Sequence, residues 1–112
     1  MSKTLGAAAR RRKGHDFERW VARQLREIEP SVKRGLQSRG GTAEEPDVHF
    51  PGLHIECKCQ KRPDAWAALK QAAEAAAGTD VPVAICKRSG TEPVVTMHFA
   101  DWVAMLRKSR GK

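Results

Sequence analysis

Cysteine is scarce in this chain, and its spacing argues against a disulfide framework. Only three of the 112 residues are cysteine, an odd number, and Cys57 and Cys59 lie two positions apart. Small secreted domains that rely on disulfides carry more cysteines, in patterns that allow complete pairing. We therefore expect a single domain with its own hydrophobic core, in a reducing cytosol.

Long apolar segments and aromatic residues are also scarce. The apolar stretch at the N-terminus covers only residues 5–9, and no segment offers the about eighteen apolar residues that a membrane span needs. The sequence therefore predicts neither export nor membrane spanning. Tyrosine is absent. Trp20, Trp66 and Trp102 each fall on the apolar stripe of a predicted helix, which favours packing in the core over stacking on bases.

Negative charge is outweighed by positive charge. The 21 lysines and arginines exceed the 13 acidic residues, which gives a formal net charge of +8 and a pI of about 9.9. A field of this sign attracts polyanions, so nucleic acid is the first partner class to consider, although a ribosomal protein or a membrane-surface binder has similar charge. Both ends are basic, and each either contacts phosphates or is a solvated tail. The basic residues are Arg10, Arg11, Arg12 and Lys13 at one end, and Arg107, Lys108, Arg110 and Lys112 at the other.

Hydrophobic periodicity predicts one α/β domain, with a mixed sheet of about five strands flanked by helices. Phe17, Val21, Leu25 and Ile28 mark the apolar stripe of a first helix, which Pro30 ends. We divide the chain into a basic arm (1–13), the domain (14–106) and a basic tail (107–112). The expected helices cover 14–29, 64–77 and about 100–108, and the expected strands cover about 32–37, 47–50, 53–59, 81–87 and 93–99.

The segment from Asp47 to Cys59 predicts a hairpin with one apolar and one polar face. A two-residue turn at Pro51-Gly52 pairs Asp47 with Glu56, and strand alternation then assigns every side chain to a face. The predicted apolar face holds Val48, Phe50, Leu53, Ile55 and Cys57, and the predicted polar face holds Asp47, His49, His54, Glu56 and Lys58.

Two opposed carboxylates on that polar face indicate a cation site. Their Cβ atoms lie about 5 Å apart, which is unfavourable unless a cation lies between them. Carboxylate oxygens suit Mg²⁺ or Mn²⁺, and Lys58 reaches the same volume from the same face. This set of groups matches phosphodiester hydrolysis. The alternative is an exposed strand face stabilised by ion pairs of Asp47 and Glu56 with Lys58.

Three short motifs together resemble the PD-(D/E)XK nuclease superfamily. They are Phe17-Glu18-Arg19 in the first helix, Pro46-Asp47 before a strand, and Glu56-Cys57-Lys58 in the paired strand. The order of helices and strands is similar to the restriction-endonuclease-like core of that superfamily. The small size, the GHDFERW helix and the SRGG loop most resemble Holliday junction resolvases of the archaeal and phage type, over roughly residues 14–105.

The resemblance implies a set of roles. Asp47 and Glu56 would be metal ligands, Glu18 would bind the metal directly or through water, and Lys58 would be the catalytic lysine. Ser38, in the loop before Pro46-Asp47, would shape the substrate contact, and Gln71 would lie near the active site. Contacts with DNA are expected from Arg10, Arg11, Arg12, Lys13, Arg34, Arg39, Lys61 and Arg62.

The resemblance also implies a cofactor and partners. Mg²⁺ would be the cofactor, with Mn²⁺ as a substitute and no small-molecule cofactor. Branched DNA would be the substrate of a homodimer, in the cytosol of a bacterium, an archaeon or a phage-infected host. Two alternatives stay open: a nuclease for another DNA structure, such as a flap, nick or duplex, and a catalytically silent DNA-binding module of the same fold.

Several residues also have simpler interpretations. Cys57, Cys59 and His54 suggest zinc, but a C-x-C strand directs its thiols away from His54, which favours buried thiols. His49 and His54 suit proton transfer at the site, although exposed hairpin histidines are commoner. Glu18 is otherwise a surface residue that pairs with Arg23 or with the arginine block.

Overall fold

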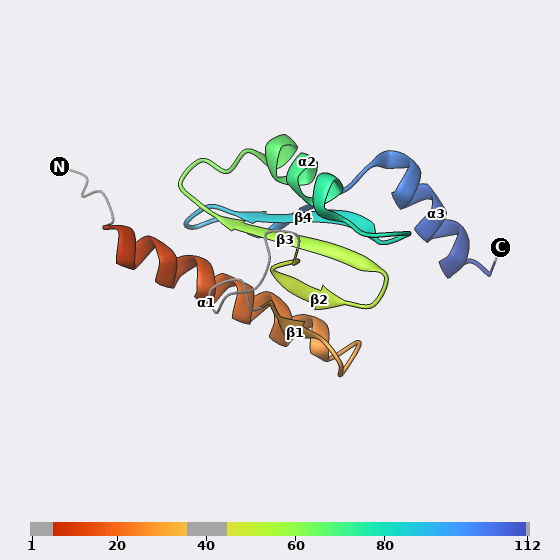
Figure 1. Ribbon diagram of the computed structural model, residues 1–112, viewed down its shortest axis with the longest axis horizontal. Coiled ribbons are helices and arrows are strands. Elements are labelled where there is room, and N and C mark those ends of the chain that lie inside the picture. Colours follow the sequence, from red (N-terminus) through yellow and green to blue (C-terminus); the bar gives the residue numbers. More distant parts are fainter. Residues whose placement is uncertain (1–5, 36–44, 112) are drawn as a thin grey trace.

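A five-stranded mixed sheet with helices on both faces forms the body of the molecule, which confirms the predicted α/β class (Figure 1). The structure is a computed structural model that describes residues 6–35 and 45–111. In this part of the chain, no helix is both long enough and apolar enough to cross a membrane. The elements are α1 (Ala7–Arg26), β1 (Lys33–Arg34), β2 (Val48–Phe50), β3 (Leu53–Cys59), α2 (Ala65–Ala75), β4 (Val81–Lys87), β5 (Val94–Thr96) and α3 (Phe99–Ser109).

The strands lie in chain order, β1-β2-β3-β4-β5. All neighbouring pairs are antiparallel except β3 and β4, which run parallel and are joined by α2. Parallel neighbours need such a crossover, and a helix is the usual one. The long strand β3 therefore lies at the centre of the sheet, with one helix over each face.

The hairpin of β2 and β3 has the predicted register. Val48 pairs with Ile55, His49 with His54 and Phe50 with Leu53, around the two-residue turn. Gly52 has a φ of 83°, which is the positive value that the third position of a type II turn requires. The predicted strand at 53–59 is confirmed in full, whereas β2 begins at Val48, one residue later than predicted.

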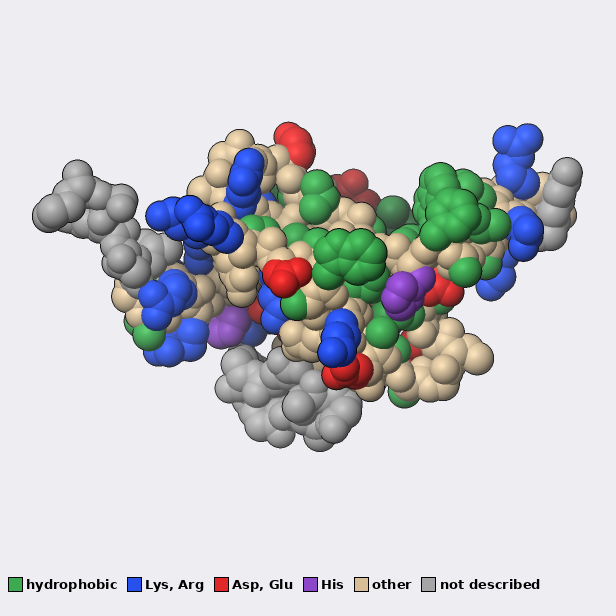
Figure 2. All heavy atoms as spheres, turned by 90° about the horizontal axis from the view of Figure 1, so that it is seen from above, with side chains coloured by type: hydrophobic (Ala, Val, Ile, Leu, Met, Phe, Trp, Pro, Cys, Tyr) green, Lys and Arg blue, Asp and Glu red, His purple; other side chains and the backbone are tan. Residues whose placement is uncertain are grey.

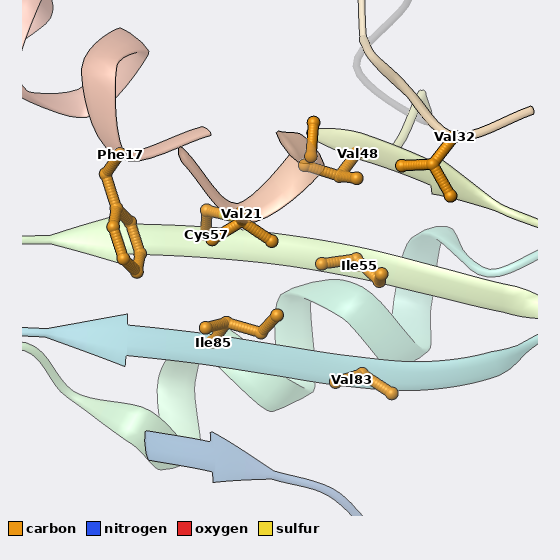
Figure 3. Close-up of a cluster of buried hydrophobic side chains, with 9 residues drawn as sticks. Phe17, Val21, Val32, Val48, Ile55, Cys57, Val83 and Ile85 are labelled. Carbon is orange, nitrogen blue, oxygen red and sulfur yellow. The ribbon is translucent and has the colours of Figure 1, made fainter. Parts of the chain in front are cut away.

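The predicted apolar face of the hairpin packs against α1. Phe17 and Val21 lie one helical turn apart and are buried over β3 and β4 (Figure 3). This packing forms the larger of two core clusters, which confirms the predicted face. Its buried members are Phe17, Val21, Ala22, Val32, Val48, Ile55, Cys57, Val83 and Ile85.

The opposite face of β3 and β4 is covered by α2. Ala68 and Leu69 are buried against Ala84 and Cys86 in a second, smaller cluster. These side chains are mostly small, so the helix approaches the sheet closely. The predicted polar face is consequently enclosed at its centre, and the interpretation of it as a solvent-exposed face is wrong for Glu56, which is only 1% exposed.

The first helix is longer at its N-terminus than predicted. It begins at Ala7, so the arginine block of residues 10–13 forms part of α1 instead of a separate arm. Alanines at 7–9 favour helix strongly enough for Gly14 to be tolerated inside it. The helix ends at Arg26, before the predicted end, which leaves Ile28 beyond it and 75% exposed.

The predicted burial of the three tryptophans is wrong. Trp66 is 82% exposed because α2 buries the stripe of Ala68, Leu69 and Ala72, which lies on the neighbouring side of the helix. Trp20 and Trp102 are also exposed, and α3 has no buried residue at all. The edge strands β1 and β5 are shorter than predicted, with two and three residues.

Gly35 allows a close approach between two segments, and its substitution tests that approach. Its N–H donates to the carbonyl oxygen of Asp47 at 2.8 Å, and a Cβ at this position would overlap the carbonyl oxygen of Pro46. We expect Gly35→Ala to lower the free energy of unfolding by about 1–3 kcal/mol, because the backbone must move apart. Urea denaturation measures this change.

Gly14→Ala is the matched control. A Cβ at Gly14 meets nothing within 4 Å, and alanine favours a helix interior by about 0.5–1 kcal/mol over glycine, so this variant should be more stable than the wild type. If Gly35→Ala is as stable as the wild type, the contact with Pro46 is not the tight one described.

Candidate active site

Glu56 lies at the centre of the candidate site. It belongs to β3, on the face covered by α2, and is almost completely buried. Its Oε1 atom lies 3.1 Å from Nε2 of His54, and Nε2 of Gln71 donates to its Oε2 atom over 3.4 Å. The carboxyl group is therefore fixed from both its own strand and α2, and Gln71 lies where the resemblance implied.

Asp47 is held beside Glu56 by three hydrogen bonds. Its N–H donates to the Ile55 carbonyl at 2.9 Å, and its own carbonyl accepts from Gly35 at 2.8 Å. Its Oδ2 atom accepts from the backbone N–H of Cys57 at 2.8 Å. Asp47 directly precedes β2. Its side chain accepts the hydrogen bond that a further residue of β2 would otherwise form with β3. The two opposed carboxyl groups that the sequence predicts do meet.

Glu18 reaches the same region from α1. It precedes Val21 and Ala22 on the buried side of that helix, and its side chain is only 17% exposed. Its Oε1 atom lies 3.6 Å from Nε of Arg34, and that nitrogen is buried without a hydrogen-bond acceptor among the described residues. Arg34 thus faces the acidic cluster from β1, and its contact with DNA stays a prediction.

Burial and mutual repulsion raise the proton affinity of two of these carboxyl groups. Burial, followed by the charge of Asp47, raises the pKa of Glu18 to about 7, against a smaller lowering by Arg34. Burial, again followed by Asp47, raises the pKa of Glu56 to about 8. Strongly shifted carboxyl groups of this kind are typical of functional sites.

Lys58 supplies positive charge to the cluster. It is half-buried, two residues after Glu56 and therefore on the same face of β3. Its charge lowers the pKa of both Glu18 and Glu56, which shows that it lies within electrostatic reach of each. Four of the five charged positions in the three motifs, Glu18, Asp47, Glu56 and Lys58, thus come together from α1, the residue before β2, and β3. Ser38 and Arg39, the other predicted residues of this region, lie outside the described residues.

His54 is buried beside Glu56, whereas the sequence favoured an exposed hairpin histidine. This residue is only 3% exposed, and burial lowers the pKa of its ring, so the neutral form is favoured beside Glu56. Its place two residues before Glu56 on one strand face was a usable signal, but the cover provided by α2 was not visible in the sequence. His49, on the same strand face as Asp47, instead pairs with Glu45 at 2.8 Å.

The acidic cluster offers carboxylate oxygens but no complete protein cage for a metal. Within residues 6–35 and 45–111, no group of three or more His, Cys, Asp or Glu side chains is arranged to hold a metal ion. Mg²⁺ does not need one, because it is usually bound through one or two carboxylates and keeps several waters. Asp47 and Glu56 therefore fit Mg²⁺ as a pair, with Glu18 nearby.

The predicted DNA contacts outside the site gather at one end of the molecule. Figure 2 shows Lys and Arg side chains over that end, where the first turns of α1 lie (Figure 1). Nζ of Lys13 donates to Oγ of Ser89 at 2.8 Å, which ties α1 to the turn after β4. Lys61 and Arg62 are exposed directly after β3, the strand that carries Glu56.

The cysteines have the predicted positions. Cys57 is buried in the cluster under α1, and Cys59 packs partly against the same cluster. Both thiols therefore lie on the face opposite His54. Burial also raises the pKa of the Cys57 thiol, which keeps it protonated and unreactive.

The raised pKa of Glu56 predicts how stability depends on pH when no divalent cation is present. The folded protein holds this proton more tightly than the unfolded chain, so the stabilisation is full below pH 4.5 and is lost as pH rises through about 8. In Glu56→Gln this loss is absent. Urea denaturation in EDTA should therefore show the wild type losing stability relative to Glu56→Gln between these pH values.

Comparing the wild type with Glu56→Gln separates the pH dependence that Glu56 contributes from the one that His54 contributes. His54 contributes a pH dependence of opposite sign, since its pKa is lowered, but it is present in both. Parallel curves of stability against pH for the two proteins would contradict the raised pKa of Glu56.

The function of the protein is inferred from the chemical groups of this site. Its geometry brings an acidic pair, a third carboxyl group and a lysine to one position beside the central strand. In comparisons with known proteins, no family model, no curated protein and no solved structure matches this chain.

Proposed function

We propose that this protein is a metal-dependent endonuclease that hydrolyses phosphodiester bonds in DNA. One observation carries the proposal: Asp47 and Glu56 meet beside the central strand, with Glu18 and Lys58 within electrostatic reach. Carboxylates packed so closely repel one another, and a divalent cation relieves that repulsion. The fold holds these groups together at a cost in stability, as a catalytic site often requires.

The residues of the site have distinct tasks in this proposal. Asp47 and Glu56 would hold Mg²⁺, which when bound supplies a polarised phosphate and an activated water. The Cys57 N–H fixes the orientation of Asp47, and His54 and Gln71 fix that of Glu56. The ammonium group of Lys58 would stabilise negative charge that develops on the phosphate. Arg34 limits the repulsion between Glu18 and Asp47.

The charge distribution supports DNA as the substrate. The chain carries a net charge of +8 while the site itself is acidic, so the basic residues outside the site would attract the polyanion. They lie on the first turns of α1 and directly after β3. A four-way junction is the proposed preferred substrate, cut symmetrically by a homodimer, and flap, nick or duplex cleavage is the alternative within the same chemistry.

A catalytically silent DNA-binding module is the second candidate. The ion pair of Arg34 with Glu18 favours it, because a cation already balances one carboxylate of the cluster. Such a module would bind DNA with the same basic residues and would not respond to Mg²⁺. Cleavage in the presence and absence of Mg²⁺ separates the two candidates.

Neutralising the acidic pair separates cleavage from binding. We expect Asp47→Asn and Glu56→Gln each to reduce Mg²⁺-dependent cleavage of labelled four-way junctions at least about 100-fold, because a ligand is lost. Both variants should bind junctions as tightly as the wild type or more tightly, since neither adds negative charge and Asp47→Asn removes a charge that repels phosphate. Gel assays of cleavage and binding measure both effects.

Glu74→Gln is the matched control, an identical substitution at an exposed position on α2, one turn after Gln71. It should cleave at the wild-type rate. Wild-type cleavage by Asp47→Asn or Glu56→Gln would exclude the proposed site. If the wild type binds DNA but does not cut it, the catalytically silent DNA-binding module is the remaining candidate.

The arginine block predicts the salt dependence of DNA binding. Each phosphate contact contributes about 0.9 to the slope of log affinity against log salt, so changing all four residues at 10–13 to Gln should reduce the slope by about 3 to 4 if all make contact. Substitution is preferable to truncation because these residues belong to α1. Fluorescence anisotropy at several salt concentrations measures the slope. An unchanged slope would mean that the block does not touch DNA.

A further inference from the structure

The C-terminal helix α3 carries a row of large apolar side chains that the described part of the chain leaves uncovered. None of its residues is buried, and Phe99 is 74% exposed. No other described helix or strand packs closely against α3. Figure 2 shows hydrophobic side chains gathered over this end of the molecule. Spacings of three and four place Phe99, Trp102, Val103 and Leu106 in one stripe along the helix.

Strand β5, which leads into α3, also carries exposed apolar side chains. It is the last strand in the sheet order, so one of its edges lacks a neighbouring strand among the described elements. Val94 and Val95 are 54% and 63% exposed. An exposed apolar edge strand and an uncovered amphipathic helix each favour contact with another protein chain.

The charges along α3 favour a second copy of this chain as the partner. Asp101 lies in the first turn, whereas Arg107 and Lys108 lie in the last. Antiparallel packing of two copies sets the acidic end of each helix near the basic end of the other, and it also opposes the two helix dipoles. Parallel packing would bring the basic ends together. We propose that α3 and the edge of β5 form the interface of a two-fold symmetric homodimer.

The size of the surface indicates a reversible dimer. The eleven residues of α3 extend about 16 Å, and a standard interface buries about 800 Å² on each partner. A stripe of this length is short for such an area, so the proposed interface includes the edge of β5 as well. Dimer formation should therefore depend on protein concentration within a readily measured range.

The position of α3 leaves the rest of the molecule accessible in such a dimer. The molecule is elongated, with a longest extent of 54 Å, and α3 lies at the end opposite the first turns of α1 (Figure 1). Two-fold packing through α3 would therefore keep the basic ends of both copies exposed. The inference does not rest on the proposed nuclease activity, since self-association is measured without DNA.

Sedimentation velocity of the full chain over a wide concentration range tests the interface. The wild type should shift from monomer to dimer, and Trp102→Glu should weaken the dimer by at least about 30-fold, as expected for an interface hot spot. Trp66→Glu is the control, because this tryptophan is 82% exposed on α2, and it should dimerise like the wild type. Unchanged thermal unfolding of Trp102→Glu would confirm its folding, because α3 buries no residue.

A monomeric wild type at every concentration would overturn the proposal, as would normal dimerisation of Trp102→Glu. If the wild type stays monomeric and Trp102→Glu loses DNA binding, α3 would instead be identified as a nucleic-acid surface.

Cysteine cross-linking tests the antiparallel arrangement. Val103 lies at the middle of the stripe, so its two copies meet near the two-fold axis, whereas the two copies of Arg110 lie about 20 Å apart along the helices. In a Cys59→Ser background, oxidised Val103→Cys should form a disulfide-linked dimer and Arg110→Cys should not. The remaining Cys57 and Cys86 are buried. Cross-linking by both variants, or by neither, would contradict the antiparallel interface.

Discussion

The buried carboxyl group of Glu56 is the constraint on which the site depends. A carboxylate without water or a partner costs several kcal/mol, so the fold either supplies partners or keeps the group protonated. It does both: His54 and Gln71 contact the two oxygens, and burial raises the pKa to about 8. The charge of Asp47, held beside Glu56, adds to the effect of burial in raising that pKa. The proposed cation would take the place of the proton that Glu56 holds beside Asp47.

The register of the hairpin and its apolar face were predictable because they depend on local rules. A two-residue turn at Pro51-Gly52 fixes the pairing, and alternation then separates Ile55 from Glu56. Asp47 follows from the same register: its N–H donates to the Ile55 carbonyl on β3, and its side chain accepts from Cys57. The meeting of the two acidic residues was therefore accessible from sequence alone.

The remaining features depend on packing between distant elements. The burial of Glu56 requires α2 to lie on that face. The alanine-rich sequence of α2 fits several helix rotations, and the predicted stripe through Trp66 and Leu69 is buried at Leu69 but not at Trp66. The ion pair of Arg34 with Glu18 joins β1 to α1, and nothing local in either segment signals it. Exposed aromatic residues on α3 mimic a core stripe, because a helix that packs on a partner chain has the same periodicity as one that packs on its own.

Binding of Mn²⁺ to the protein in the absence of DNA tests most directly whether the acidic cluster is a cation site. Isothermal titration calorimetry with Mn²⁺ should give saturable binding to the wild type and to Glu74→Gln, and none to Asp47→Asn. Saturable binding that Asp47→Asn retains would place the cation elsewhere. The absence of binding to the wild type would leave the clustered carboxyl groups of Glu18, Asp47 and Glu56 without the role assigned to them.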